Sequence, residues 1–297
     1  MDYNNLSAFG EVREYESMAG HVTLGVGGAA RCYFRPHDLD ALVASMTKIP
    51  SEIPLLVIGR GSNLLVTDAG FDGVVIDLAS LQGISLDGTL LHCQAGCRMS
   101  QVAARCADAG LAGAEFMATV PGNIGGGVAM NAGAFGHQFS DILQRVALLH
   151  RDGRREAVAA DALKMAYRHS VLPTGALVVG AEFELQRDDA EAIRGRIRAM
   201  RTKRGVSQPL AQPNCGSVFK NPPGDHAARL IEAAGLKGER CGQAQISPQH
   251  ANFIVNLGGA SSQDVLHLMT VAQRAVKLQS DIHLEPELKV VGSWCEQ

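Results

Sequence analysis

Residues 116–136 read FMATVPGNIGGGVAMNAGAFG, which places six glycines in 21 positions. The residues between these glycines are mostly apolar, whereas a flexible linker is rich in serine and other polar side chains. We therefore expect an ordered segment whose backbone lies close to something flat. Close packing of a helix against a strand, with glycines at the contact, is the alternative explanation.

A second glycine cluster precedes it in the sequence LVIGRGSNLL, which spans residues 56–65. Glycines allow consecutive backbone N–H groups to converge on an anion, and Ser62 and Asn63 add side-chain donors. This composition is typical of a turn that holds a phosphate group. A simple hairpin turn between two apolar strands explains the same residues.

A third cluster, residues 25–30, matches the dinucleotide-binding pattern G-x-G-x-x-A. That pattern binds a pyrophosphate only when a buried strand precedes it and a helix follows it. Here the sequence continues as RCYFRP over residues 31–36, which is extended and ends in a helix breaker. We therefore predict that this segment is not part of a Rossmann fold.

The composition indicates a folded chain of about two domains, because 297 residues exceed the usual size of one domain. Apolar residues make up 46% of the chain, and the mean hydropathy is +0.04. The net charge of −3 and the lack of a basic stripe outside Arg194–Arg204 argue against a nucleic-acid partner. That basic run follows a helical pattern, where a solvated helix face explains it.

The sequence also predicts a cytoplasmic location. The N-terminal stretch is polar, with no signal-peptide apolar region, and no apolar run approaches the length of a membrane span. The number of cysteines is odd and they form no C-x-x-C pair, so we expect reduced thiols and no metal site. The cysteines are Cys32, Cys93, Cys97, Cys106, Cys215, Cys241 and Cys295.

Residue periodicity predicts mixed helices and strands without a regular βαβ repeat. Strands are expected over 53–58, 73–78 and 90–94, and a helix over 100–108 that ends before Gly110. The segment 176–186 alternates, which predicts a strand with one apolar face. That face consists of Leu177, Val179, Ala181, Phe183 and Leu185.

A charged helix is predicted from Asp188 and Asp189 to about Arg204, and the proline-containing stretch 207–213 follows it. We place a domain boundary near 200–207. The C-terminal part is expected to contain an amphipathic helix and then a short strand. The apolar face of this helix consists of Val265, Leu268, Ala272 and Ala275.

Together these motifs resemble the UDP-N-acetylenolpyruvoylglucosamine reductase family. The resemblance starts with V-I-G-x-G-S-N-L-L and P-G-x-x-G-G-x-x-x-M-N-A-G-A-F-G and covers about residues 20 to 292, in order. It continues through YRHS at 167–170, NCGSVFKNP at 214–222, HANFIVN at 250–256 and LEPEL at 284–288. The short sequence after residue 168 is similar to the subtype without an extra substrate-covering loop.

The resemblance implies an α+β fold with two domains. Residues 1–203 would form an FAD-binding domain of the vanillyl-alcohol-oxidase (PCMH) type with two subdomains, and 204–297 a smaller α+β substrate-binding domain. The two glycine clusters would bind the FAD pyrophosphate. The implied cofactor-binding residues are Gly59, Arg60, Gly61, Ser62, Asn63, Pro121, Gly122, Gly125, Gly126, Asn131, Gly133 and Arg201.

The implied reaction reduces the enolpyruvyl ether of a UDP-sugar, giving UDP-N-acetylmuramate for peptidoglycan and so for cell-wall growth, cell shape and cell division. NADPH reduces FAD, flavin N5 delivers hydride, and a serine supplies the proton. Chemically, the step needs a cation at the developing negative charge and a proton donor. The family motifs assign these tasks to Arg168, which we expect at the end of a helical pattern, and to Ser217 and Glu287.

Glu287 has a neighbour that spacing alone does not exclude. In an extended segment Glu285 and Glu287 share one face, and Leu284 and Leu288 point the opposite way. The family motif assigns the second glutamate, so Glu287 is the predicted catalytic residue and Glu285 the alternative.

The resemblance implies substrate contacts for Tyr167, Lys220 and Asn221. It also places a basic residue against the flavin near the domain boundary, for which Arg201, Lys203 and Arg204 are candidates and Arg201 is chosen. The expected partners are the UDP-sugar and NADPH, with a monomeric chain and no nucleic acid or membrane.

Four further residues carry weaker expectations. Cys215 precedes the serine motif, so its thiol is hypothesised to be sensitive to oxidation. His250 and Asn256 are expected to support the fold of the second domain. His21 lies in a block, His-Val-Thr, to which no specific role is given.

Two other functions are compatible with parts of the sequence. Another FAD-dependent oxidase or dehydrogenase could use the same FAD-binding domain, and a non-catalytic module could bind a flavin or nucleotide-sugar. The first is disfavoured because Ser217, Asn221 and Glu287 match this family. The second would be expected to lack Arg168, Ser217 or Glu287, and the chain has all three.

Overall fold

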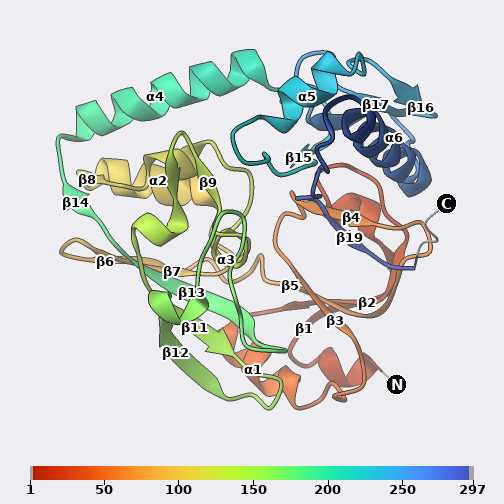
Figure 1. The fold of residues 1–297 in the computed structure, drawn as a ribbon. Coiled ribbons are helices and arrows are strands. Elements are labelled where there is room, and N and C mark those ends of the chain that lie inside the picture. The colour runs from red at the N-terminus through yellow and green to blue at the C-terminus, as the bar shows by residue number, and fades with distance from the viewer. Residues whose placement is uncertain (1–2, 294–297) are drawn as a thin grey trace. The chain divides into compact units, whose positions relative to one another are not determined.

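A computed structural model describes residues 3–293 of the chain (Figure 1). The chain divides into two compact units. The first contains Cys32–Arg60, Gly73–Arg204 and the N-terminal residues up to Glu14; the second contains Tyr15–Arg31, Gly61–Asp72 and the residues from Gly205 onward. The family resemblance implies a division of the chain between residues 203 and 204. In the structure, residues 15–31 and 61–72 belong to the same compact unit as the C-terminal residues.

One sheet has the strand order β1-β2-β5-β3, with β3 parallel to β5. Its strands are β1 (Gly10–Ser17), β2 (Ala29–Pro36), β3 (Leu55–Ile58) and β5 (Phe71–Asp77). The helix α1 (Leu39–Met46) begins after Asp38, whose carboxylate accepts a hydrogen bond from Ala41 N at 2.8 Å. Such a cap satisfies one of the free N–H groups of the first turn. The strands predicted over 53–58 and 73–78 are therefore present.

The central sheet of the first unit is antiparallel, with strand order β12-β11-β13-β7-β6. Its strands are β6 (Ile84–Asp87), β7 (Leu90–Gln94), β11 (Leu143–Leu149), β12 (Arg155–Ala159) and β13 (Leu177–Glu184). The prediction of a strand over 176–186 is confirmed, but the prediction of a single apolar face is wrong. Leu177 and Val179 pack into one hydrophobic cluster, whereas Ala181 and Phe183 pack into another.

A β-bulge explains this change of face. Ala147 pairs with Gly180, but the next residue of β11, Leu148, pairs with Val178, so β13 has one extra residue at this point. An extra residue reverses the side of the sheet to which the following side chains point. The sequence pattern of period two continues through the bulge and does not reveal it.

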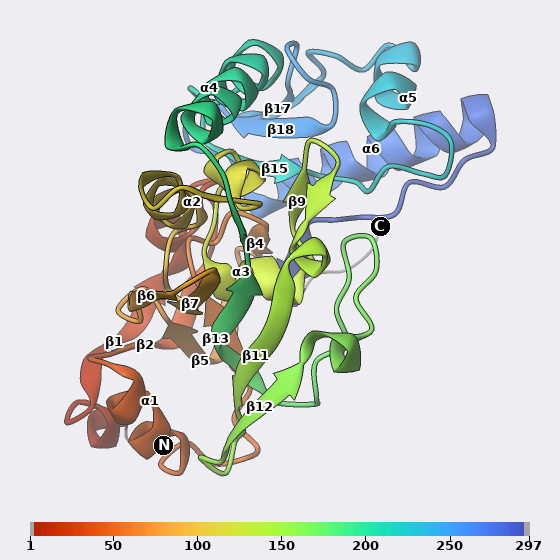
Figure 2. The same ribbon diagram turned by 90° about the vertical axis from the view of Figure 1, so that its left-hand side faces the viewer.

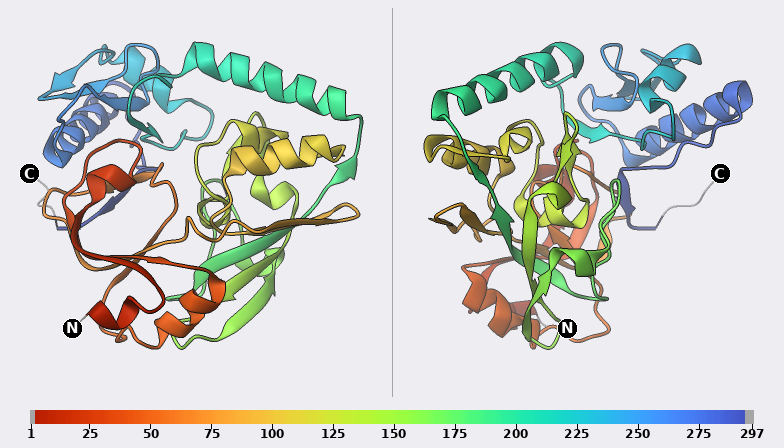
Figure 3. Two further views of the ribbon diagram at one scale, coloured as in Figure 1. Left: turned by 180° about the vertical axis from the view of Figure 1, so that it is seen from behind. Right: turned by 60° about the vertical axis from the view of Figure 1, so that its left-hand side comes forward.

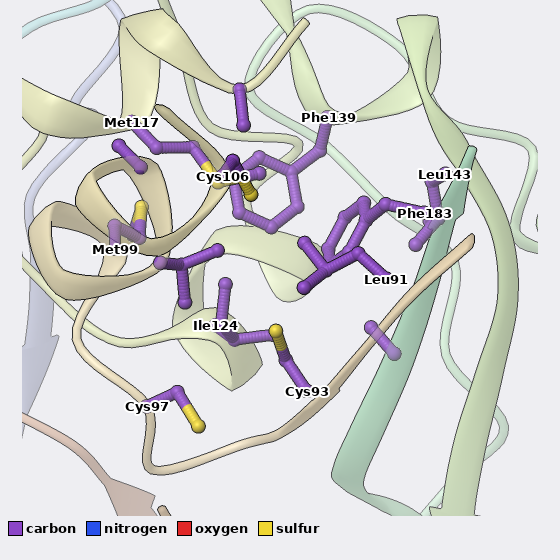
Figure 4. Packing of buried hydrophobic residues seen from close by; sticks show 14 of the residues in the cluster. Leu91, Cys93, Cys97, Met99, Cys106, Met117, Ile124, Phe139, Leu143 and Phe183 are labelled. Atoms are coloured by element: carbon purple, nitrogen blue, oxygen red, sulfur yellow. The ribbon is translucent and has the colours of Figure 1, made fainter. Parts of the chain in front are cut away.

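Two helices cover the face of this sheet that carries Ala181 and Phe183 (Figure 2). They are α2 (Met99–Asp108), close to the predicted 100–108, and α3 (Ile124–Ala129), which lies in the glycine-rich segment. Figure 4 shows the rings of Phe139 and Phe183 meeting in this core, with centroids 5.3 Å apart at 83°. A Cβ atom on Gly127 of α3 would lie 2.3 Å from the Phe139 ring. Close packing of α3 therefore requires glycine at this position.

Short elements and one long helix complete the first unit. The short strands form two antiparallel pairs, β8 (Leu111–Ala112) with β14 (Gln186–Arg187) and β9 (Gly133–Ala134) with β10 (His137–Gln138). The 3-10 helices are Tyr3–Leu6, Glu115–Ala118, Phe139–Asp141 and Ala160–Leu163. The long helix α4 (Ala190–Ser207) agrees with the predicted charged helix and extends three residues past Arg204.

The second unit contains an antiparallel sheet of order β15-β18-β17-β16, and α6 packs against β16 and β17 (Figure 3). Its elements are β4 (Leu64–Val66), β15 (Asn214–Ser217), α5 (Ala227–Ala233), β16 (Arg240–Cys241), β17 (Ala244–Ile246), β18 (Phe253–Asn256), α6 (Ser262–Ser280), β19 (Lys289–Val291) and a 3-10 helix at Met18–His21. The C-terminal amphipathic helix and strand are as predicted, except that Val276 rather than Ala275 is fully buried in α6.

Two predictions about the glycine clusters are decided by strand pairing. The hairpin explanation of residues 56–65 is wrong, because β3 pairs with β5 while β4 pairs with β19 in a different sheet. The prediction that residues 25–30 are not a Rossmann motif is confirmed, since they lead into the strand β2 rather than a helix. Close packing explains this cluster: a Cβ atom on Gly28 would lie 2.4 Å from Asp68 O.

The part of the chain that the structure describes has no helix both long enough and apolar enough to cross a lipid bilayer.

We expect Gly127→Ala to destabilise the chain by about 1–3 kcal/mol, because the new methyl group overlaps the Phe139 ring. Urea unfolding without added ligand measures this change. Gly126→Ala is the matched control, since, apart from its chain neighbours and the backbone of its own helix, no described atom lies within 4 Å of its Cβ position. In a helix this control is expected to be neutral or stabilising by up to about 1 kcal/mol. Equal losses in both variants would contradict the packing argument.

Candidate functional site

Asn123 connects the two glycine clusters within the first unit. Its side chain is almost completely buried; Oδ1 accepts from Arg60 N at 2.8 Å and Nδ2 donates to Gly96 O at 2.5 Å. A Cβ atom on Gly59 would lie 2.5 Å from Asn123 Oδ1, so only glycine allows this contact. Sequence reasoning missed Asn123, although it occupies a variable position of the P-G-x-x-G-G motif. The structure thus brings Gly59 and Arg60 next to Pro121–Gly126.

The glycines of α3 serve different purposes. Gly125 and Gly127 face the protein, because Cβ atoms there would meet Ala95 at 3.0 Å and Phe139 at 2.3 Å. The close-packing alternative is therefore correct for these two residues. Gly126 is exposed and has no described atom within 4 Å of its Cβ position, so packing does not account for it. An exposed glycine backbone beside a second glycine turn fits a flat, anionic cofactor such as FAD.

The glycine turn that begins with Gly59 and Arg60 continues into the second unit from Gly61 onward. Gly61 has a φ of +59°, and a Cβ atom on it would lie 2.5 Å from His21 O. Thr23 N donates to Gly61 O at 3.3 Å, which assigns the His-Val-Thr block to support of this turn. Asn63 Nδ2 donates to Glu287 O at 3.0 Å. The second part of the turn is therefore attached to one of the predicted catalytic residues.

Arg168 lies in a tight turn rather than at the end of a helix, so that expectation is wrong. The preceding 3-10 helix ends at Leu163 because Lys164 adopts a left-handed conformation. Ala166 and His169 then exchange two backbone hydrogen bonds around Tyr167 and Arg168. The Arg168 guanidinium donates to Gly133 O at 3.0 Å and lies 5.0 Å from the centre of the Tyr167 ring. The structure thus groups Arg168 with Tyr167 and Gly133.

Ser217 and Glu287 lie on neighbouring segments of the second unit. Ser217 is the last residue of β15 and pairs with Phe253 of β18. On the other side, Glu287 N donates to Val218 O at 2.8 Å. The backbone therefore positions Glu287 beside the residue that follows Ser217, and both side chains are half-buried.

The structure distinguishes the two glutamates that the spacing left open. Leu284 and Leu288 are buried, as expected for the opposite side of the segment. Glu285 is exposed, and its carboxylate forms an ion pair with Lys220 Nζ at 2.5 Å. Its carbonyl oxygen also accepts from Lys220 N at 2.9 Å. Glu285 is thus engaged by Lys220, whereas Glu287 is attached to Asn63 and Val218.

Asn252 is a second residue whose role the sequence did not indicate. Its buried amide donates to Phe219 O at 2.8 Å and accepts from Phe219 N at 2.9 Å. An amide bonded to both groups of one residue acts like a neighbouring strand and fixes the segment from Ser217 to Lys220.

Asn221 accepts from Ala227 N at 3.1 Å and so is linked to the start of α5. Asn256 bonds Leu24 O and Gly258 N, as expected of a fold-supporting residue.

Of the three basic residues near the end of α4, Arg204 forms a hydrogen bond to the glycine-rich segment. Its guanidinium donates to Thr119 O, two residues before Pro121. Burial lowers the pKa of Arg204 to about 10, so it remains protonated at neutral pH. Lys203 lies 5.9 Å from the centre of the Phe135 ring. Arg201, the residue chosen from the sequence, is exposed.

The hypothesis that Cys215 is sensitive to oxidation is contradicted by its surroundings. Its side chain is buried in the core of the second unit. Burial raises the pKa of the Cys215 thiol to about 12, and a protonated thiol is a poor nucleophile. The six cysteines of residues 3–293 are free thiols, as predicted, while Cys295 lies outside the described residues.

We expect Cys215 to resist alkylation by iodoacetamide in the folded chain at pH 8 and to react completely in urea. Cys241 provides the internal comparison, because it is partly exposed. Peptide mass spectrometry after timed labelling measures both sites. Labelling of Cys215 as fast as Cys241 in the folded protein would show that the thiol is accessible.

Comparison with known proteins identifies close relatives over almost the whole chain. UDP-N-acetylenolpyruvoylglucosamine reductase of Alkalilimnicola ehrlichii is 42% identical over 284 residues, covering 95% of each chain. The reductase of Methylococcus capsulatus is 43% identical over 281 residues, covering 94% of this chain and 92% of the relative. The solved structure of the Thermus caldophilus reductase superposes with a TM-score of 0.83 at 36% identity, covering 95% of this chain and 99% of the other.

Two family models match separate parts of the sequence. A model described as an FAD binding domain matches residues 30–158, and one described as the C-terminal domain of UDP-N-acetylenolpyruvoylglucosamine reductase matches residues 208–291. The predicted α+β fold, with an FAD-binding domain before a second domain, is therefore confirmed. The predicted resemblance is also confirmed: the chain belongs to the UDP-N-acetylenolpyruvoylglucosamine reductase family.

Proposed function

We propose that this chain uses NADPH to reduce the enolpyruvyl ether of UDP-N-acetylglucosamine enolpyruvate to UDP-N-acetylmuramate. The product would be a precursor for peptidoglycan synthesis, made in the cytoplasm. Family membership supports the reaction class, and one structural observation supports the chemistry most directly. Glu287 is bonded through its backbone to Val218, next to Ser217, and to Asn63 of the glycine turn. These bonds support the proposal that Ser217 and Glu287 act close to Asn63, a candidate cofactor contact.

The candidate FAD-binding residues are given separately for each unit. In the first unit we propose Gly59, Arg60, Pro121, Gly122, Gly126 and Gly133, with Arg204 in place of Arg201; in the second unit we propose Gly61, Ser62 and Asn63. Gly125 is left out because it packs against Ala95. Bound FAD would supply the two-electron carrier between NADPH and the sugar. The exposed backbone at Gly126 and the cation at Arg204 both fit this cofactor.

Arg168 is proposed to bind the carboxylate of the substrate. Its planar guanidinium suits two parallel hydrogen bonds to a carboxylate, and its positive charge stabilises negative charge that develops next to that group. Gly133 O and the Tyr167 ring hold the guanidinium. Tyr167 therefore orients Arg168 while its own exposed ring remains available for substrate contact.

In this reaction Ser217 would donate the proton, and Glu287 would assist Arg168 at the developing charge. Asn63 and Val218 hold the backbone of Glu287, and Asn252 holds the segment that follows Ser217. Lys220 and Asn221 are proposed as substrate contacts. Because Lys220 is paired with Glu285, a phosphate of the substrate would have to replace that carboxylate.

We expect Gly126→Ala to weaken FAD binding at least about tenfold, which corresponds to ~1.4 kcal/mol. The reason is that the methyl group would fill the open space at Gly126, which in this proposal faces the cofactor. Titration of the FAD-free chain by flavin fluorescence measures the affinity. Unchanged affinity in a variant that remains folded would argue against FAD contact at this face.

We expect the flavin absorbance of the FAD-loaded protein to be bleached by NADPH and restored by the enolpyruvyl sugar. In Ser217→Ala the first step should stay within about twofold of the unchanged protein, while the second should slow by about 10²–10⁴ because the proton donor is lost. Stopped-flow absorbance measures each step separately. Ser217→Cys retains a side-chain proton and should recover part of the rate.

Two results would contradict this proposal. Failure of NADPH to bleach the flavin would exclude the proposed reductant, and failure of the enolpyruvyl sugar to restore the colour would exclude the proposed substrate. Equal slowing of both steps in Ser217→Ala would instead show that Ser217 supports the fold.

A further inference from the structure

We propose that Asn131 and Ser170 are positioning residues for Arg168. Their side chains attach the turn over residues 166–170 to residues 128–133, which are part of the glycine-rich segment. Nothing in the family resemblance assigned them this role, and Asn131 was predicted to bind the cofactor. The inference rests on the proposed function, in which Arg168 binds the carboxylate of the substrate.

Three hydrogen bonds from side chains to backbone carbonyls join the two segments. Ser170 Oγ donates to Val128 O at 2.6 Å, and Asn131 Nδ2 donates to Ala166 O at 3.0 Å. The third bond comes from Arg168 itself, whose guanidinium donates to Gly133 O at 3.0 Å. The bonds are distributed along both segments, so together they resist rotation of the turn as well as its displacement.

The amide of Asn131 is fully engaged by the protein. Its side chain is completely buried, and its Oδ1 accepts from Ser140 N at 3.0 Å. Besides Ala166 O, its Nδ2 lies 3.2 Å from Gln138 Oε1 and 3.4 Å from Ser140 Oγ. An amide with both ends bonded internally has little capacity left for a cofactor. The geometry therefore favours a structural link to Ala166 over direct cofactor contact.

Asparagine also suits the backbone at this position. Asn131 has a φ of +41°, a left-handed conformation that asparagine tolerates better than most residues. The same residue thus provides both the bend after α3 and the amide that reaches Ala166. Aspartate has nearly the same shape and tolerates the same conformation, which makes it a suitable test substitution.

The turn that carries Arg168 needs such support because hydrophobic packing contributes little to it. Tyr167 is 48% exposed, and the residues on both sides of Arg168 are exposed. Arg168 has a φ of +54°, which is unfavourable for a side chain of this size. Displacement of a catalytic group by about 1 Å can lower a rate about 10²-fold. Loss of one fastening bond is therefore expected to affect the chemical step more than the fold.

The test compares Asn131→Asp and Ser170→Ala in the FAD-loaded protein. Asn131→Asp keeps the acceptor for Ser140 N but replaces the donor to Ala166 O with a carboxylate oxygen. Ser170→Ala removes only the bond to Val128 O. We expect reoxidation by the enolpyruvyl sugar to slow about tenfold or more in each variant. Flavin reduction by NADPH should remain within about twofold.

Gln138→Ala is the matched control. It removes another hydrogen-bond partner of Asn131 but leaves the link to Ala166 in place. Its sugar step should stay within about threefold of the unchanged protein. Hydrogen exchange gives a readout that does not depend on turnover: the peptide containing His169, whose N–H bonds to Ala166 O, should exchange faster in Asn131→Asp and Ser170→Ala than in the control.

A double-mutant cycle with Arg168→Lys separates positioning from general damage. If Asn131 acts through Arg168, Asn131→Asp should add little to the loss that Arg168→Lys already causes. Additive losses, or equal slowing of both flavin steps, would overturn the inference while leaving the proposed function intact. No loss in Arg168→Lys would overturn the inference together with the proposed role of Arg168.

Discussion

The buried amide of Asn123 is the interaction on which the candidate cofactor site depends. It satisfies Arg60 N and Gly96 O at the same time, so it connects three loops that are distant in the sequence. A buried amide without partners costs about 1–3 kcal/mol, and therefore these loops are held in one arrangement. Gly59 is required because any Cβ atom would displace this amide.

Once this connection is made, neighbouring features follow from it. The chain enters α3 directly after Asn123, and the packing of Gly125 and Gly127 onto Ala95 and Phe139 leaves Gly126 exposed. The segment after α3 then forms hydrogen bonds with the turn that carries Arg168. The second unit contains two similar hydrogen-bonded asparagines. Asn63 holds Glu287 and Asn252 holds Phe219, in each case through a side-chain amide on the backbone of another segment.

Sequence patterns predicted the helices α2, α4 and α6, a minority of the strands, the glycine clusters and the family, because these depend on local composition and spacing. They did not predict the bulge in β13, which leaves the alternating pattern unchanged while reversing the side to which residues point. They also did not separate Glu285 from Glu287, since the difference lies in Lys220, a partner distant in the sequence. Asn123, Asn131 and Asn252 were missed as linkers for the same reason. The burial that raises the pKa of the Cys215 thiol is likewise a property of the folded core.

The bulge in β13 has a consequence for how the first unit loses its structure. Leu177 and Val179 contribute to one hydrophobic cluster, and Ala181 and Phe183 contribute to the other. A single strand at the centre of the sheet thus belongs to two cores at once. Neither core can melt without removing packing from the other, so the two halves of this unit are expected to unfold as one cooperative block.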